Sequence, residues 1–167
     1  MRIPFVGLIV LAVTACHANQ ADDAAAERRA EAAHDTAFAS TQARGEMAMG
    51  VDQYTSTHVF EPLSDGGRIE LQRDEPDSAG TAQIRAHMQT IATAFAAGDF
   101  RIPGFVHAQT VPGTDVMAAK RALITYTVDT LPRGAAVRLQ TTDSAAVQAV
   151  HEFLAFQRQA HHAHAMH

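Results

Sequence analysis

Histidine is the residue type in this chain that most strongly suggests chemistry. Ten histidines occur in 167 residues, together with six methionines and a single cysteine. A neutral imidazole is the commonest metal ligand in proteins, and a thioether is a soft ligand. Histidine and methionine together therefore favour copper(I) or a similar ion, whereas histidine alone suits copper(II), nickel or zinc.

Five side chains are candidate ligands for a site inside the folded part of the chain. A single histidine at the margin of an apolar stripe is more often a half-exposed, hydrogen-bonded residue than a ligand, so the prediction depends on several of them converging. The candidate metal ligands are His58, His87, His107, Met117 and His151.

A second set of donors is expected to collect metal as an auxiliary. Met47 and Met49 point the same way in an extended chain, although methionines so placed more often cover a core edge. The segment from His161 to His167 holds four imidazoles and is predicted, from composition, to bind metal ions as a flexible tail. The auxiliary candidates are Met47, Met49, His161, His162, His164 and His167.

The motifs give little support for catalysis. The chain has no Gly-x-Ser-x-Gly elbow, Walker loop, His-Glu-x-x-His or Cys-x-x-Cys-His motif. His107 or His87 could pair with Asp99 or Asp52 as a general base, but no electrophile-stabilising motif accompanies the pair. The few aromatic residues give no specific support for haem. We therefore predict no catalytic residues and no enzyme activity.

Composition excludes several other classes of protein. Lys and Arg number 13 against 18 Asp and Glu, and no basic patch is present, which argues against a nucleic-acid partner. A single cysteine excludes an internal disulfide and a zinc site built on cysteines. The length and the 47% hydrophobic content suit one globular domain with accessory segments.

The first sixteen residues carry an export signal. A charged start precedes an apolar run at 3–13, which is too short to span a bilayer. Residues 13–16, Val-Thr-Ala-Cys, resemble a bacterial lipobox, in which the cysteine is acylated; the alternative is an ordinary secretory signal. The lipobox predicts a signal peptide over 1–15 and a lipid on Cys16. The residue after the cysteine is His17 and not Asp, which by resemblance to lipoprotein sorting rules favours a periplasm-facing lipoprotein of the outer membrane.

Composition divides the rest of the chain into three parts. Residues 16–46 have Phe38 as their only large apolar side chain and are predicted to form an alanine-rich helical or disordered tether. Residues 47–159 are predicted to form an α+β domain. Residues 160–167 make the histidine-rich tail.

One strand–turn–strand–helix pattern occurs twice in the domain. Residues 69–72, Ile-Glu-Leu-Gln, match residues 137–140, Val-Arg-Leu-Gln, at an offset of 68, and each set follows an earlier strand and a turn. Each hairpin precedes an apolar stripe at helical spacing, ending before Gly98 in the first copy and starting after Ser144 in the second. Two ββα units predict an α+β fold with a four-stranded antiparallel sheet and two helices on one face.

The two copies are joined by a long connection at residues 99–120. Pro103-Gly104 and Pro112-Gly113 are expected to break regular structure there. Long connections often carry functional residues, which strengthens His107 and Met117 as candidates.

Several short motifs occur together between residues 47 and 158. They are Met49-Gly50-Val51-Asp52-Gln53 with Thr57-His58-Val59-Phe60, Ile84-Arg85-Ala86-His87 with Phe95-Ala96-Ala97-Gly98-Asp99-Phe100, Phe105 to Met117, and His151 to Gln157. As a set they resemble an uncharacterised family of exported bacterial proteins, with motifs MGxDQ, TxHxF, IRxH, FAxGDF and HxFLxFQ. The chain has His58-Val59-Phe60 where His-His-Phe is commoner, and the resemblance implies export without implying an activity.

These observations lead to one functional hypothesis and one alternative. The hypothesis is a cell-envelope lipoprotein that binds a transition metal ion, copper favoured, through His and Met ligands, as a carrier, a buffer or an accessory to resistance. The membrane, through the lipid, and the metal ion are its expected partners, with an envelope protein as a further one. The alternative is a non-catalytic interaction module of the envelope in which the histidines are incidental.

Overall fold

The computed structural model of the chain describes residues 35–163. The chain divides into two compact units, Met1–Ala37 and Phe38–His167, and the structure describes only residues 35–37 of the first, which are helical. The predicted signal peptide and Cys16, and His164 and His167 of the tail, lie outside the described residues. No helix in the described part is long and apolar enough to cross a bilayer.

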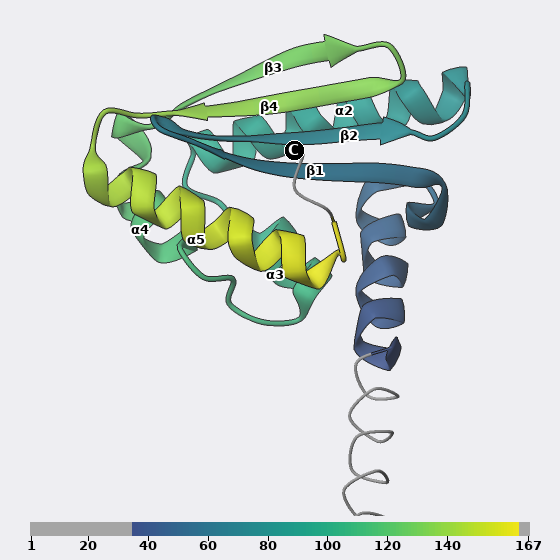
Figure 1. The fold of residues 1–167 in the computed structure, drawn as a ribbon, viewed down its shortest axis with the longest axis horizontal. Helices are drawn as coiled ribbons and strands as arrows, with labels where there is room; N and C mark the ends of the chain where they lie inside the picture. The colour runs from purple at the N-terminus through teal and green to yellow at the C-terminus, as the bar shows by residue number, and fades with distance from the viewer. Residues whose placement is uncertain (1–34, 164–167) are drawn as a thin grey trace, which may run out of the picture. The chain divides into compact units, whose positions relative to one another are not determined.

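Four antiparallel strands form the sheet of the second unit. They are β1 (Ser56–Leu63), β2 (Gly66–Arg73), β3 (Thr125–Leu131) and β4 (Gly134–Gln140), in the order β1-β2-β4-β3 (Figure 1). The two hairpins therefore meet at the centre of the sheet through β2 and β4, and β1 and β3 are its edges.

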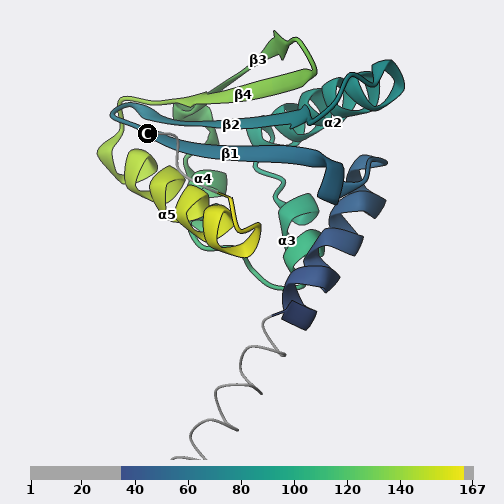
Figure 2. The ribbon, with the colours of Figure 1, turned by 45° about the vertical axis from the view of Figure 1, so that its right-hand side comes forward.

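Two long helices, α2 (Ser78–Ala96) and α5 (Ser144–Ala160), pack on the same face of the sheet (Figure 2). Asp77 and Asp143 cap them, each accepting a hydrogen bond from the backbone N–H three residues later. This arrangement confirms the predicted fold class. Helix α2 packs mainly against β3 and β4, and α5 packs against β1 and β2. The helix of each ββα unit therefore covers the hairpin of the other ββα unit. Neither unit would bury its apolar faces alone.

A single hydrophobic core fills the space between the sheet and the helices. Apolar side chains alternate along β2 and β4 because successive residues of a strand face opposite sides of the sheet. The helices contribute stripes with three- and four-residue spacing. Among the most buried side chains are Leu71, Ile84, Met88, Phe95, Val137, Leu139, Val150, Phe153 and Leu154.

The register of the central strands shows how the two units are related. Ile69 faces Val137 across the β2–β4 pair, and 137 − 69 = 68 is the offset of the sequence repeat. When a residue pairs with its own counterpart, a pseudo-twofold axis passes between the two residues. Here the axis passes between Ile69 of β2 and Val137 of β4. The helices repeat at a smaller offset, 143 − 77 = 66 between the capping aspartates, because the connection after β4 is two residues shorter.

The offset of 66 makes Arg85 of α2 the counterpart of His151 of α5. Arg85 donates through Nη2 and Nε to the carbonyls of Leu131 (2.6 Å) and Gly134 (3.1 Å), at the β3–β4 turn. His151 Nε2 lies 2.9 and 3.0 Å from the carbonyls of the corresponding residues of the β1–β2 turn, Leu63 and Gly66. Each long helix thus holds the turn of the hairpin that it covers.

The connection between the units differs from the predicted irregular loop. It contains the helices α3 (Arg101–His107) and α4 (Thr114–Ala119) and the 3-10 turn η2 (Arg121–Leu123). Pro103 is the third residue of α3, where its missing N–H leaves no helical bond unmade. Pro112 and Gly113 separate the two short helices.

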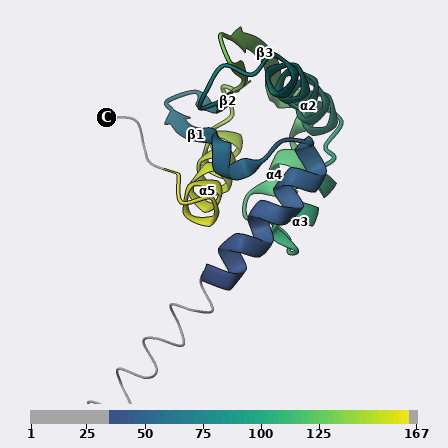
Figure 3. The same cartoon turned by 90° about the vertical axis from the view of Figure 1, so that its right-hand side faces the viewer.

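The compact unit begins before the predicted domain. Residues 35–49 are helical, and from Phe38 onward they belong to the unit, followed by the 3-10 turn η1 (Gln53–Thr55). Thr41 and Gln42 are buried, and Arg44 Nε donates to the carbonyl of Val106 in α3 at 2.6 Å. Figure 3 shows residues 38–49 crossing close to α3. This part of the predicted tether packs through small and polar side chains, which hydrophobic patterning does not detect.

Candidate functional site

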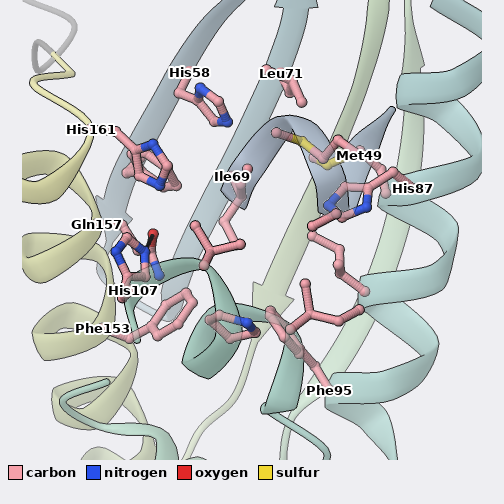
Figure 4. A pocket seen from close by; sticks show the side chains of 18 residues that line it. Met49, His58, Ile69, Leu71, His87, Phe95, His107, Phe153, Gln157 and His161 are labelled. Atoms are coloured by element: carbon pink, nitrogen blue, oxygen red, sulfur yellow. Dashed lines mark hydrogen bonds between the residues drawn. The ribbon is translucent and has the colours of Figure 1, made fainter. Parts of the chain in front are cut away.

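A pocket with four histidines opens between the sheet, α2, α3, α5 and the helical residues 45–49. Its volume is about 70 Å³, and most of its wall is apolar, with Phe60, Ile69, Phe95 and Phe153 among the lining residues (Figure 4). The polar and sulfur-bearing side chains that line it are His58, His87, His107, His161, Gln157, Met49 and Met88. The pocket therefore brings together three of the five candidate ligands, His58, His87 and His107, and two of the auxiliary ones, Met49 and His161.

Each histidine comes from a different element. His58 shares the inner face of β1 with Phe60, two residues away. His87 projects from the middle of α2, and His107 is the last residue of α3. His161 is the C-cap of α5.

Three of the rings form one group. The ring centroids of His58 and His161 are 4.8 Å apart, with 25° between the ring planes, and those of His107 and His161 are 5.1 Å apart, with 82° between the planes. His87 lies across the pocket, on the same side as the Met49 thioether (Figure 4).

Hydrogen bonds fix which nitrogen of two rings carries the proton. His107 Nε2 lies 2.9 Å from Gln157 Oε1, and because an amide oxygen only accepts, Nε2 is the donor and Nδ1 keeps its lone pair. The His87 ring donates to the backbone carbonyl of Ala48, which again leaves the other nitrogen free to accept. His161 Nδ1 is buried without a hydrogen-bond partner among the described residues.

Burial keeps these imidazoles neutral. Burial, followed by the nearby His87 and His107, lowers the pKa of His58 from 6.5 to about 4. Burial also lowers the pKa of His87 to about 4. The pKa of His107 is lowered by burial, against the opposing effect of its bond to Gln157.

His161 shows the strongest effect. Burial, followed by the neighbouring His58, His107 and His162, lowers its pKa to about 2. Neutral rings at physiological pH have lone pairs ready to bind an ion without first losing a proton.

The donors do not yet surround a common point. Within residues 35–163, no three His, Cys, Asp or Glu side chains have a geometry that would hold a metal ion. The rings of His58 and His161 are stacked. Because the lone pair of an imidazole nitrogen lies in the plane of its ring, the nitrogens of these two rings do not point toward one another. Rotation about the Cβ–Cγ bonds, whose torsional preference is broad, would be needed to turn them inward.

The other candidates lie elsewhere. His151 holds the β1–β2 turn, and Met117 is fully buried in the core. Met47 is 69% exposed and is not among the residues lining the pocket. The offset of 66 makes Phe153 the counterpart of His87, and His151 is the counterpart of Arg85. His162 stacks on Phe38 at 4.0 Å, outside the pocket.

Two site residues carried a sequence signal that the prediction did not use. The apolar stripe of α2 is Ile84, Met88, Ile91 and Phe95, and the same spacing in α5 gives Val150, Leu154, Gln157 and His161. Gln157 is 4% exposed. Extending the stripe by one turn would have placed Gln157 and His161 against the core, whereas His161 was predicted to lie in the tail.

Comparison of the chain with protein-family models, curated proteins and solved structures found no match.

Proposed function

We propose that this chain is a cell-envelope lipoprotein, attached through Cys16, that binds one transition metal ion, copper favoured, in the histidine pocket. The ligands are His58, His107 and His161, with His87 and Met49 on the facing wall. The protein acts as a carrier or buffer of the ion or as an accessory to resistance, and the lipid keeps it at the periplasmic side of the outer membrane.

The spacing of the three rings is the observation that carries the proposal. An imidazole nitrogen lies about 2.0 Å from a bound ion, so the ring centroids of two imidazoles on one tetrahedral ion lie about 5 Å apart. The centroid separations of 4.8 Å for His58 and His161 and 5.1 Å for His107 and His161 match this value. The ring centres can therefore stay in place while the rings turn.

The environment of the donors also fits an ion. The bonds of His107 to Gln157 and of His87 to Ala48 are of the kind that orient metal-ligating histidines. The partnerless Nδ1 of His161 is a buried polar atom that costs about 1–3 kcal/mol unless something binds it. A metal ion would satisfy it.

The donor set favours copper(I) over harder ions. No Asp or Glu lines the pocket, whereas the thioethers of Met49 and Met88 and four imidazoles do. Carboxylate and water ligands suit magnesium, calcium and manganese, and soft ligands select copper(I). An apolar wall also disfavours a more highly charged ion that keeps its hydration shell.

The test is anaerobic titration of the purified chain with copper(I) in competition with a chromophoric copper(I) chelator. The starting protein carries His164→Ala, Met166→Ala and His167→Ala, so that these residues contribute no ligands. We expect one ion per chain, and a loss of affinity of at least tenfold in His58→Phe and in His107→Phe. Circular dichroism checks that each variant is folded.

The matched control is His151→Arg, which removes an imidazole outside the pocket and installs the residue type of its counterpart, Arg85. We expect this control to bind copper(I) within twofold of the starting protein. Absence of a stoichiometric ion in the folded starting protein, or undiminished affinity in both pocket variants, would overturn the proposal. Stoichiometric zinc without copper(I) would overturn the choice of metal.

A further inference from the structure

A larger groove lies directly outside the histidine pocket. Its volume is about 470 Å³, within the range of about 300–1,000 Å³ usual for ligand sites. His58 and His161 line both the groove and the pocket. A molecule bound in the groove would therefore lie next to the ring group.

The edge of β1 that lines the groove offers backbone hydrogen-bonding groups. Four consecutive residues of β1, Ser56 to Val59, line it. In an antiparallel pair, residues that bond to the partner strand alternate with residues whose N–H and C=O face away from it. The N–H of Asp74 donates to the Thr55 carbonyl at 3.1 Å, so bonds to β2 recur at every second residue from Thr55. The backbone groups of Ser56 and His58 therefore face away from β2, and within residues 35–163 β1 pairs with no other strand.

Beyond His58 the same edge is closed. Phe60 is the next outward-facing residue, and its carbonyl accepts a hydrogen bond from Arg158 Nη1 at 2.8 Å. Pro62 follows in the same alternation and has no N–H to donate. Such features protect sheet edges against unwanted pairing. The β1 edge is thus protected along its second half and open where the groove lies.

Two walls flank this open edge. Phe38 and Gln42, from the helical residues 38–49, line one of them, and residues 161–163, at the end of α5, line the other. A single extended segment fits between two walls, whereas a second copy would bring the same two walls along with its own β1 edge. The shape therefore favours a lone segment of another protein over a sheet that continues between two copies.

The lining residues define the chemistry of that segment. None of them is Asp, Glu, Lys or Arg, so a charged side chain would lose its hydration without gaining a counter-charge. Gln42 and Gln53 also line the groove, are 6% and 3% exposed, and each have an Oε1 atom without a hydrogen-bond partner among the described residues. An amide oxygen accepts from N–H groups, and an added strand has such groups on the edge that β1 does not use. The groove therefore suits an uncharged peptide segment.

We propose that an uncharged, extended segment of a partner protein adds to β1 in this groove, with a methionine side chain beside the histidine rings. Paired residues of neighbouring strands point their side chains to the same face, so the segment residue paired with His58 points the same way as the His58 ring. A methionine there brings a soft ligand to the ring group. Copper(I) passes between partner and pocket by ligand exchange, with no change of oxidation state. This transfer rests on the proposed function, and the strand addition does not.

Strand addition is tested with the metal-free full chain and the peptide acetyl-Thr-Val-Met-Val-Thr-amide. Amide hydrogen exchange is followed residue by residue by NMR. At saturation we expect at least tenfold slower exchange at Ser56 and His58, and less than twofold change at Thr57 and Val59, which already bond to β2. The same peptide with an N-methyl group on its methionine lacks one strand-pairing N–H and should bind at least tenfold more weakly.

A matched pair of variants tests the groove itself. Tyr54→Ser removes a ring that is 64% exposed in the groove and should weaken peptide binding at least threefold. Leu123→Ser removes a side chain that is 55% exposed outside the groove and should leave peptide binding unchanged. Equal effects of the two variants would overturn the placement of the peptide in the groove. Circular dichroism checks that both variants are folded.

The role of the methionine is tested with the copper(I)-loaded chain and a second peptide that carries norleucine in place of methionine. We expect the methionine peptide to bind the loaded chain at least fivefold more tightly than the norleucine peptide. The two peptides should bind the metal-free chain equally well. Equal binding of both peptides to the loaded chain would overturn transfer through the methionine.

Protection that is absent, or uniform over residues 56–59, at the highest soluble peptide concentration would overturn the strand addition. Protection already present without peptide would also overturn it. If that protection disappears in a chain ending at Ala163, the chain's own end occupies the groove, and if it rises with protein concentration, a second copy does. If the folded full chain binds no copper(I), the proposed function fails, while the alternating exchange pattern still decides the strand addition.

Discussion

The two ββα units share one framework, but only parts of each contribute donors to the pocket. The counterparts of His58 and His87 of the first unit are Tyr126 and Phe153 of the second. In the other direction, Gln157 and His161 of the second unit correspond to Ile91 and Phe95 of the first. Strand counterparts are 68 residues apart and helix counterparts 66.

This difference separates the requirements of the fold from those of the site. Capping aspartates, turn glycines and the side chains that hold the hairpin turns are present in both units, because both hairpins and helices need them. Three of the four polar pocket residues compared above are histidines, and each of them has an aromatic counterpart in the other unit. The fourth, Gln157, has Ile91 as its counterpart. In each of these pairs only one member carries an imidazole or amide group, and replacing the polar residues of the pocket by their counterparts is a direct way to test the site.

The largest expected effect is the pH dependence of metal-free stability. Between pH 6.5 and 4, the unfolded chain binds protons at His58, His87 and His161 that the folded unit does not bind, because burial lowers these three pKa values. The free energy of unfolding should therefore fall as the pH is lowered through this window. The shift of His58 to about 4 corresponds to about 3 kcal/mol on its own.

Urea unfolding at pH 7 and pH 4.5 measures this fall, in the wild-type chain and in His87→Phe. The variant installs the residue type found at the counterpart, Phe153, and should lose less stability between the two pH values. Identical losses in the two proteins would show that His87 does not titrate as its burial requires.

The next effect concerns the turn glycines that both units share. A Cβ at Gly134 would overlap the carbonyl oxygen of Leu71, and one at Gly66 would overlap that of Leu139. Gly134→Ala should destabilise the unit by about 3 kcal/mol in urea unfolding. Gly104→Ala, where an added Cβ meets nothing closer than 3.7 Å, is the matched control and should leave stability the same or slightly higher. A small effect at Gly134 would mean that the close approach of the β2 and β4 backbones at this position is adjustable.

Removal of the pocket's central ring comes third. His161→Phe gives the second unit the residue type of its counterpart, Phe95, and preserves an aromatic ring against His58 and His107. We expect copper(I) affinity to fall about 100-fold, which corresponds to about 2.7 kcal/mol, in the chelator competition. His162→Phe, which changes the neighbouring imidazole outside the pocket, should bind as the wild type does. Equal losses in both variants would place the ion outside the pocket.

The smallest effects should come from the two side chains that hold the turns. Arg85→Met and His151→Leu each leave two backbone carbonyls without their donor, which should cost about 1 kcal/mol in urea unfolding. His151→Arg should restore most of the loss at its position. None of these changes should affect copper(I) affinity, and an effect of His151→Leu on affinity would argue that the two turn contacts are not equivalent.

The sequence was sufficient for the fold because the hairpins and helices follow short-range periodicities. The alternation at residues 69–72 and 137–140 and the stripe from Ile84 to Phe95 predict the elements directly. The repeat offset of 68 also gives the register of the central β2–β4 pair, since Ile69 and Val137 are repeat counterparts and also cross-strand partners. A helix was one of the two alternatives predicted for residues 16–46, but the packing of residues 38–49 in the compact unit escaped prediction because Thr41, Gln42 and Gly45 pack without forming an apolar stripe.

Residue types alone identified imidazole and thioether as the groups with chemical potential, and local patterning determined the two ββα units, because both depend on neighbours a few positions apart. Which histidines meet was decided by the tertiary structure. His58, His107 and His161 are separated by about fifty residues at each step, and they converge only because α5 crosses the opposite hairpin and ends beside β1. His151, equally prominent in the sequence, faces a turn instead, because its position on the same helix points it toward Leu63 and Gly66.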